Sequence, residues 1–183
     1  MKSQITQRVF CVGMALLVLA VTMQDASAQK RSVADRRQHP GKGFWSNQAA
    51  SRRMGHALDY SRGLSNYARQ AQTVDHGFAT SQVEEIGRNI SVAEQQLSVV
   101  RKEAQQSGDK QTVADIDQIA KDLTAASTAH ADCEKHCQQA NLDTTKLDRS
   151  AGEVTKSLES AAQRHQQMMK RLHPEATTEP KKD

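Results

Sequence analysis

The chain has 183 residues, of which 37% are hydrophobic, 25% are charged and only 3% are aromatic, and its formal net charge is +4. So few aromatic residues and a mean hydropathy of −0.72 exclude a bulky mixed core, but they suit one domain in which small and aliphatic residues recur along helix faces. The three cysteines are too few for a disulfide-stabilised scaffold.

Residues 1–28 have the features of a cleaved export signal. Lys2 and Arg8 supply a positive start, an apolar run follows over 9–21, and Ala26-Ser27-Ala28 offers the small residues that a signal peptidase accepts. The apolar run is short for a membrane span and no second one follows, so we expect no integral membrane span. The sequence therefore predicts an exported protein, periplasmic or secreted.

Residues 29–44 predict a basic, flexible arm without sustained periodicity. Lys30 to Arg69 carries nine Lys/Arg against two Asp, whereas Gln70 to Asp183 carries 14 Lys/Arg against 18 Asp/Glu. The arm could serve an anionic partner, or its charge could complement the acidic remainder of the chain. An exported protein seldom meets nucleic acid, so no nucleic-acid partner is expected.

Residues 45–173 predict four amphipathic helices, because apolar residues recur at alternating steps of three and four. Turn signals separate the runs near residue 74, at Ser107-Gly108-Asp109 and at Asn141 to Asp143, and His173-Pro174 ends the last helix. In the second run, Ser81 to Glu84 could form a capping box, or the helix could extend back to His76. The four predicted seams comprise Ala50, Met54, Ala57, Ser61, Leu64, Ala68 and Ala71; Ala79, Val83, Ile86, Ile90, Ala93, Leu97, Val100 and Ala104; Val113, Ile116, Ala120, Leu123, Ser127, His130, Glu134 and Cys137, widened by Ile119, Ala126 and Cys133; and Leu147, Ala151, Val154, Leu158, Ala161, His165, Met168 and Leu172.

Four such runs joined by short turns predict an all-α, antiparallel up-down four-helix bundle with coiled-coil-like seams. The alternative is a pair of long helical hairpins that form a homodimer. Residues 174–183 predict a disordered polar tail.

The densest group of reactive side chains lies in the third run. His130, Cys133 and Cys137 stand at i, i+3 and i+7, so they share one narrow sector of a helix. Thiolate and imidazole ligands favour Cu(I) and Zn(II). The spacing therefore predicts a copper or zinc site, with His76 or Glu84 of the second helix as a further ligand.

The Cys-x-x-x-Cys spacing of Cys133 and Cys137 resembles the motif of four-helix copper-binding and copper-storage proteins, which carry many such pairs. This resemblance covers these two residues alone, and it implies copper as the metal.

Other interpretations of the cluster stay open. The histidines and cysteines could simply fill a small-residue core, since Cys is among the most buried residue types. The two thiols could also form a strained, labile disulfide. The order Cys-Glu-Lys-His-Cys does not fit covalent haem attachment, and no catalytic motif stands out, so we do not expect an enzyme. A thiophilic metal-binding protein thus competes with a structural or interaction protein of the cell envelope that has an envelope protein as its partner and no ligand.

Overall fold

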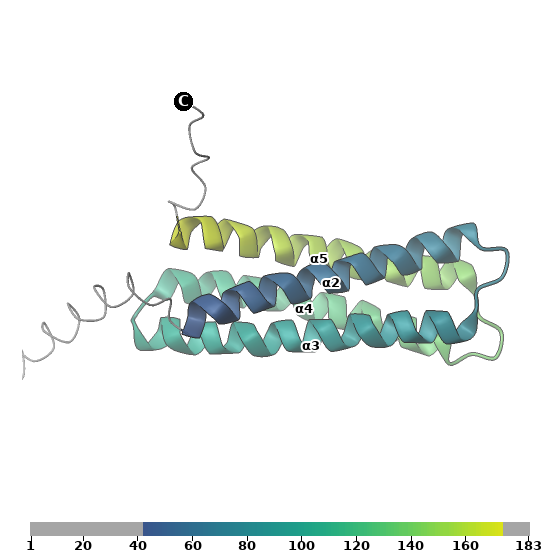
Figure 1. The fold of residues 1–183 in the computed structure, drawn as a ribbon, viewed down its shortest axis with the longest axis horizontal. Helices are drawn as coiled ribbons and strands as arrows, with labels where there is room; N and C mark the ends of the chain where they lie inside the picture. Colours follow the sequence, from purple (N-terminus) through teal and green to yellow (C-terminus); the bar gives the residue numbers. More distant parts are fainter. Residues whose placement is uncertain (1–41, 174–183) are drawn as a thin grey trace, which may run out of the picture. The chain divides into compact units, whose positions relative to one another are not determined.

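The computed structural model describes residues 42–173. The predicted signal peptide, the predicted tail and all but the last residues of the predicted arm lie outside this part of the chain. Within it, the fold consists of four long helices (Figure 1): α2 Lys42–Gln70, α3 His76–Gln106, α4 Lys110–Cys137 and α5 Thr144–Leu172. No helix in this range is apolar over enough of its length to cross a membrane.

The four helices form an antiparallel bundle, as the seam spacing predicts. Each helix packs against two neighbours, α2 against α3 and α5, and α4 against α3 and α5. The long helices are possible because no proline occurs between Pro40 and Pro174, so nothing interrupts the backbone hydrogen bonds. One end of the bundle therefore holds the α2–α3 and α4–α5 connections. The other end holds the start of α2, the α3–α4 turn and the end of α5 (Figure 1).

Three aspartates cap the N-termini of α3, α4 and α5. Asp75, Asp109 and Asp143 each accept hydrogen bonds from backbone N–H groups in the first turn of the helix that follows. Gly108 adopts a left-handed conformation with φ of +72° in the turn between α3 and α4, which is the usual role of glycine after a helix end. The turn signals at 107–109 and 141–143 are thus confirmed.

The starts of α3 and α2 test two sequence-based expectations. Of the two starts considered for α3, the one at His76 is confirmed and the capping box at Ser81 is wrong, because the carboxylate of Asp75 caps the helix. The start of α2 differs from the expectation, because this helix begins at Lys42, inside the segment predicted as a flexible arm. Phe44 lies against the ring of His173 at the end of α5, and this packing extends the helix over Lys42 to Phe44.

The core consists mainly of alanine, leucine, isoleucine and valine. The α3 seam is confirmed in full, and the α5 seam is buried except at the half-buried Leu172. The predicted α4 seam is partly wrong, because Ala120 and Glu134 are exposed and Ser127 is only half-buried. The buried face of α4 instead consists of Thr112, Ile116, Ile119, Leu123, Ala126, Ala129, Cys133 and Cys137. Ile119 and Ala126 offer more apolar surface than Ala120 and Ser127, so the helix is rotated toward them.

Ion pairs join neighbouring helices along the surface of the bundle. Arg62 and Arg69 of α2 pair with Glu159 and Asp148 of α5 at 2.7 and 3.1 Å. Further pairs join Arg101 to Asp117, Arg164 to Asp122 and Arg171 to Asp115. At least two of the basic side chains of α2 therefore complement acids of the same bundle. Each exposed pair contributes little to stability.

Candidate functional site

Cys133 and Cys137 lie in the last two turns of α4, next to the α4–α5 connection. Both are free thiols and both are buried, with exposed fractions of 0% and 4%. Their i, i+4 spacing puts them on the same face of the helix, on adjacent turns. We call this end of the bundle, with the connections at 71–75 and 138–143, the thiol end.

The thiol of Cys133 is engaged with α5. Its Sγ atom donates to the hydroxyl of Ser150 at 3.2 Å, and that hydroxyl lies 3.0 Å from the backbone carbonyl of Lys146. Burial raises the pKa of Cys133 to about 11, and burial also raises the pKa of Cys137. Both sulfurs are therefore protonated near neutral pH, which suits packing and opposes nucleophilic or redox reactivity.

His130 is directed away from the thiols, toward α3. Its Nε2 atom lies 2.8 Å from the backbone oxygen of Val83, and because a carbonyl can only accept, this nitrogen carries the proton. The ring occupies a slot at Gly87, where an added Cβ would lie 2.6 Å from the His130 Cε1 atom. A carboxylate oxygen of Glu134 stands 3.9 Å from the same Nε2. The hydrogen bond leaves Nδ1 as the nitrogen with a free lone pair.

His76 and His136 differ in exposure. His76, predicted as a further ligand and standing at seam spacing three residues before Ala79, is the first residue of α3 and is exposed, so that seam position is wrong. His136 is half-buried, and its Nδ1 atom is inaccessible to solvent without a hydrogen-bond partner among the described residues. The structure therefore brings Cys133 and Cys137 together, whereas His130 turns to α3 and His76 to solvent. Residues 42–173 contain no group of three or more His, Cys, Asp or Glu side chains arranged to hold a metal ion.

Sequence reasoning missed the groups that engage these side chains. Ser150 is buried among the aliphatic residues of the α5 seam, and a serine flanking a predicted seam is the one signal that could have drawn attention to it. The Val83 carbonyl gives no sequence signal, because every residue has one. Gly87 could have been noticed as a glycine inside a helix, which often marks close packing.

A second buried polar pair lies nearer the opposite end. His165 of α5 is 2% exposed, and its Nε2 atom lies 3.3 Å from the side-chain oxygen of Asn47 on α2. Burial lowers the pKa of His165 to about 4, so the ring is neutral near neutral pH. The predicted seam position of His165 is confirmed, and its chemistry is that of a core hydrogen bond.

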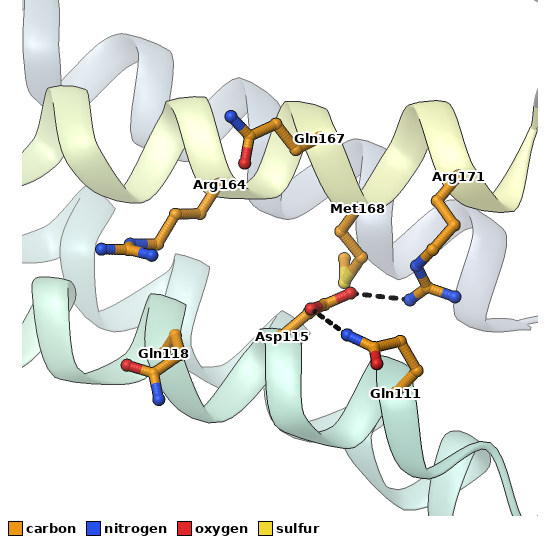
Figure 2. Close-up of a pocket in the computed structure, with 7 residues that line it drawn as sticks. All are labelled: Gln111, Asp115, Gln118, Arg164, Gln167, Met168 and Arg171. Atoms are coloured by element: carbon orange, nitrogen blue, oxygen red, sulfur yellow. Dashed lines mark hydrogen bonds and ion pairs between the residues drawn. The ribbon is translucent and has the colours of Figure 1, made fainter.

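Two shallow grooves run between α4 and α5. The groove in Figure 2, about 220 Å³, is lined by Gln111, Asp115, Gln118, Arg164, Gln167, Met168 and Arg171. Arg171 donates to the carboxylate of Asp115, which also accepts from Gln111 (Figure 2), and Arg164 donates to Asp122. These arginines are therefore neutralised within the protein. The other groove, about 660 Å³, is lined mainly by small and acidic residues of the same helices, including Ala125, Ala129 and Asp132.

Among the described residues, the largest exposed apolar side chain stands at the start of α2. Trp45 is 57% exposed, and its ring meets the edge of Phe44 at 5.2 Å between centroids. Phe44 in turn meets the ring of His173 at 5.4 Å. We call this end of the bundle, defined by Phe44, Trp45 and His173, the aromatic end.

Comparison of the chain with protein-family models, curated proteins and solved structures gave no match.

Proposed function

We propose that this protein is a structural or interaction module of the cell envelope that works through its surface, without a ligand and without catalytic activity. The predicted signal over residues 1–28 supports the location. One observation carries the proposal: His130 and Cys133, two of the three clustered donors on α4, are already hydrogen-bonded inside the bundle, to Val83 and Ser150. These groups act as packing that fixes α4 against α3 and α5.

The second candidate function is binding of a thiophilic metal. Two free thiols on adjacent turns of one helix favour it, because two thiolates suffice for Cu(I), whereas Zn(II) usually takes four ligands. The hydrogen bond from His130 to Val83 also leaves Nδ1 of His130 available as a third donor. Binding would require Cys133 to lose a proton despite its pKa of about 11, so affinity would fall as pH drops.

Native mass spectrometry of the reduced protein with one equivalent of Cu(I) or Zn(II) separates the two functions. The structural function predicts no retained metal and an unchanged melting temperature. The double variant Cys133→Ala/Cys137→Ala is the matched control. One Cu(I) retained by the wild type but not by this variant, with a raised melting temperature, would overturn the structural function in favour of metal binding.

A further inference from the structure

We propose that the last turn of α4 is a redox switch, in which oxidation of Cys133 and Cys137 to a disulfide releases this turn from α5. This inference rests on the proposed function, in which the reduced thiols act as packing, and it names how that packing is regulated. It depends on where the thiols lie in α4, on the hydrogen bonds that hold the turn, and on one buried polar atom of His136.

The position of the thiols limits how much structure a disulfide would disrupt. Cys137 is the last residue of α4, Cys133 lies one turn earlier, and both are free. In a helix, Cβ atoms at i and i+4 are about 5–6 Å apart, whereas a disulfide needs roughly 3.5–4.5 Å. The bond therefore forms only when the last turn unwinds. The exposed residues 138–141 follow directly, so unwinding one turn suffices.

Few backbone hydrogen bonds close this turn against the connection that follows. The N–H of Gln138 donates to the carbonyl of Glu134 at 3.0 Å. The N–H of Gln139 donates to the carbonyl of His136 at 3.3 Å. Both glutamines are exposed, so water can replace these bonds when the turn opens. Backbone hydrogen bonds at an exposed helix end open at a small cost in free energy.

The contact with α5 can be lost without leaving Ser150 unpaired. In the reduced protein, Cys133 donates to the hydroxyl of Ser150 at 3.2 Å. That hydroxyl has acceptors of its own, the backbone carbonyls of Lys146 and Leu147 at 3.0 and 3.2 Å. A disulfide sulfur has no proton to donate, so oxidation removes the bond between the helices and leaves Ser150 hydrogen-bonded within α5.

His136 destabilises the closed form of the same turn. Its Nδ1 atom is inaccessible to solvent and has no hydrogen-bond partner within residues 42–173. A buried polar atom without a partner raises the free energy of the state that buries it. Unwinding of the turn gives this atom access to water, so His136 favours the open form.

The oxidation is a thiol–disulfide exchange with an external disulfide. Opening of the turn brings water to Cys137, where burial otherwise raises the pKa, and its thiolate attacks one sulfur of the oxidant. The S–S bond of the oxidant breaks, its other sulfur leaves as a thiolate, and Cys137 carries a mixed disulfide. Cys133 then loses its proton and attacks the sulfur of Cys137, which forms the internal disulfide and releases the second thiolate. The two electrons and two protons lost by the protein convert the oxidant to two thiols.

The test uses the chain from Gln29 to Asp183, which lacks Cys11, so that Cys133 and Cys137 are its cysteines. The reduced, metal-free protein is equilibrated with mixtures of reduced and oxidised glutathione, and remaining thiols are then blocked. Trypsin cuts after Lys135, between the two cysteines, so an internal disulfide keeps two peptides joined until they are reduced. Backbone hydrogen exchange should become faster over residues 134–139 on oxidation and stay unchanged in α2.

Folding and oxidation should oppose each other, because the disulfide opens a turn of the folded protein. In the same glutathione mixture, the ratio of disulfide to dithiol should be about tenfold lower in the folded protein than in urea. The unfolding equilibrium of the oxidised protein should shift toward the unfolded state by the same factor, since such coupling is reciprocal.

Two serine variants test the contact with α5. Ser150→Ala removes the acceptor of the Cys133 thiol, so oxidation should become faster by roughly two- to tenfold, the effect of one hydrogen bond. The matched control Ser157→Ala, farther along the same helix, should oxidise as the wild type does. Cys133→Ala and Cys137→Ala should each form no internal disulfide. Circular dichroism of each variant verifies that the helices are retained.

Several outcomes would overturn the proposal. The folded protein could form no internal disulfide in a mixture that oxidises it in urea, or it could form mixed disulfides or linked dimers instead. An internal disulfide with unchanged exchange over residues 134–139 would mean that the closed helix accommodates the bond. Oxidation of Ser150→Ala at the wild-type rate would show that α5 does not hold the turn closed. Retention of Cu(I) would contradict the proposed function, but oxidation of the metal-free protein would still test the switch, so the two failures are distinguishable.

Discussion

At the thiol end, Cys133 and Cys137 face the core and are almost fully buried, whereas at the aromatic end Trp45 leaves more than half of its surface in solvent. The sequence predicted a metal site at the thiols, which stays a prediction, and a flexible arm that extends over Phe44, which is wrong because α2 begins at Lys42. Reactive side-chain chemistry alone does not show how a side chain is placed in the fold. What distinguishes the two ends is whether neighbouring groups already engage the side chain.

The largest effect that we expect concerns the core at the thiol end. Leu147 is fully buried in the first turn of α5, so Leu147→Ala should lower the free energy of unfolding by about 2–5 kcal/mol. Urea denaturation followed by circular dichroism measures this change. Gln139→Ala, in the exposed α4–α5 connection, serves as the control and should change it by less than about 0.5 kcal/mol. An equally small effect at Leu147 would mean that this end is loosely packed.

The second prediction concerns pH and the buried His165. The unfolded chain protonates this ring below its ordinary pKa of 6.5, but the folded chain does so only near pH 4. Between these values the unfolded state binds more protons, so stability is full above pH 6.5 and falls as the pH drops toward 4. The loss should be on the order of 2 kcal/mol by pH 4.5.

His165→Gln is the matched control, because an amide can still bond Asn47 but does not titrate in this range. Denaturation of both proteins should show that, from pH 7 to 4.5, the free energy of unfolding of the wild type falls relative to that of the variant. Thr112 holds the pKa of the Asp109 carboxyl low, and Arg69 does the same for Asp148. These two groups should therefore change the stability only below this pH range. If the free energies of unfolding of the two proteins instead change with pH in parallel, His165 is accessible to water.

The smallest of the three effects concerns the thiols themselves. If Cys133 and Cys137 act as packing groups, Cys133→Ala and Cys137→Ala should each lower the free energy of unfolding by about 1 kcal/mol. In the folded protein, both should also react with iodoacetamide far more slowly than in urea, because burial raises their pKa values. Rapid alkylation of the native protein near neutral pH would mean that these thiols are exposed and reactive. It would contradict the difference in exposure between the two ends.

The fold could be predicted because its signals are local and repeated. Steps of three and four mark the seams of α3 and α5, and Asp109 and Asp143 mark helix starts by a short-range hydrogen bond. The rotation of α4 was harder to predict, because apolar residues occupy two adjacent lines of that helix. The choice between Ile119 and Ala120 then depends on which surface the neighbouring helices bury.

The arrangement at the thiol end could be predicted only in part. Sequence spacing correctly puts Cys133 and Cys137 on one face of one helix, but it does not show that His130 bonds the backbone of Val83 on another helix. Such a contact depends on the relative height and spacing of two helices, which single-helix periodicity does not determine. The exposure of Trp45 is likewise set by where α2 begins, three residues earlier than its apolar pattern indicates.

The slot at Gly87 makes the residues allowed at positions 87 and 130 depend on each other, although these positions lie far apart in the chain. Any side chain at position 87 would collide with the imidazole of His130, and a smaller residue at position 130 would leave the slot empty and remove the hydrogen bond that His130 donates to the Val83 carbonyl. Neither position can change alone without a cost. In related chains, the two residues should therefore vary together, so that a larger residue at 87 accompanies a smaller one at 130.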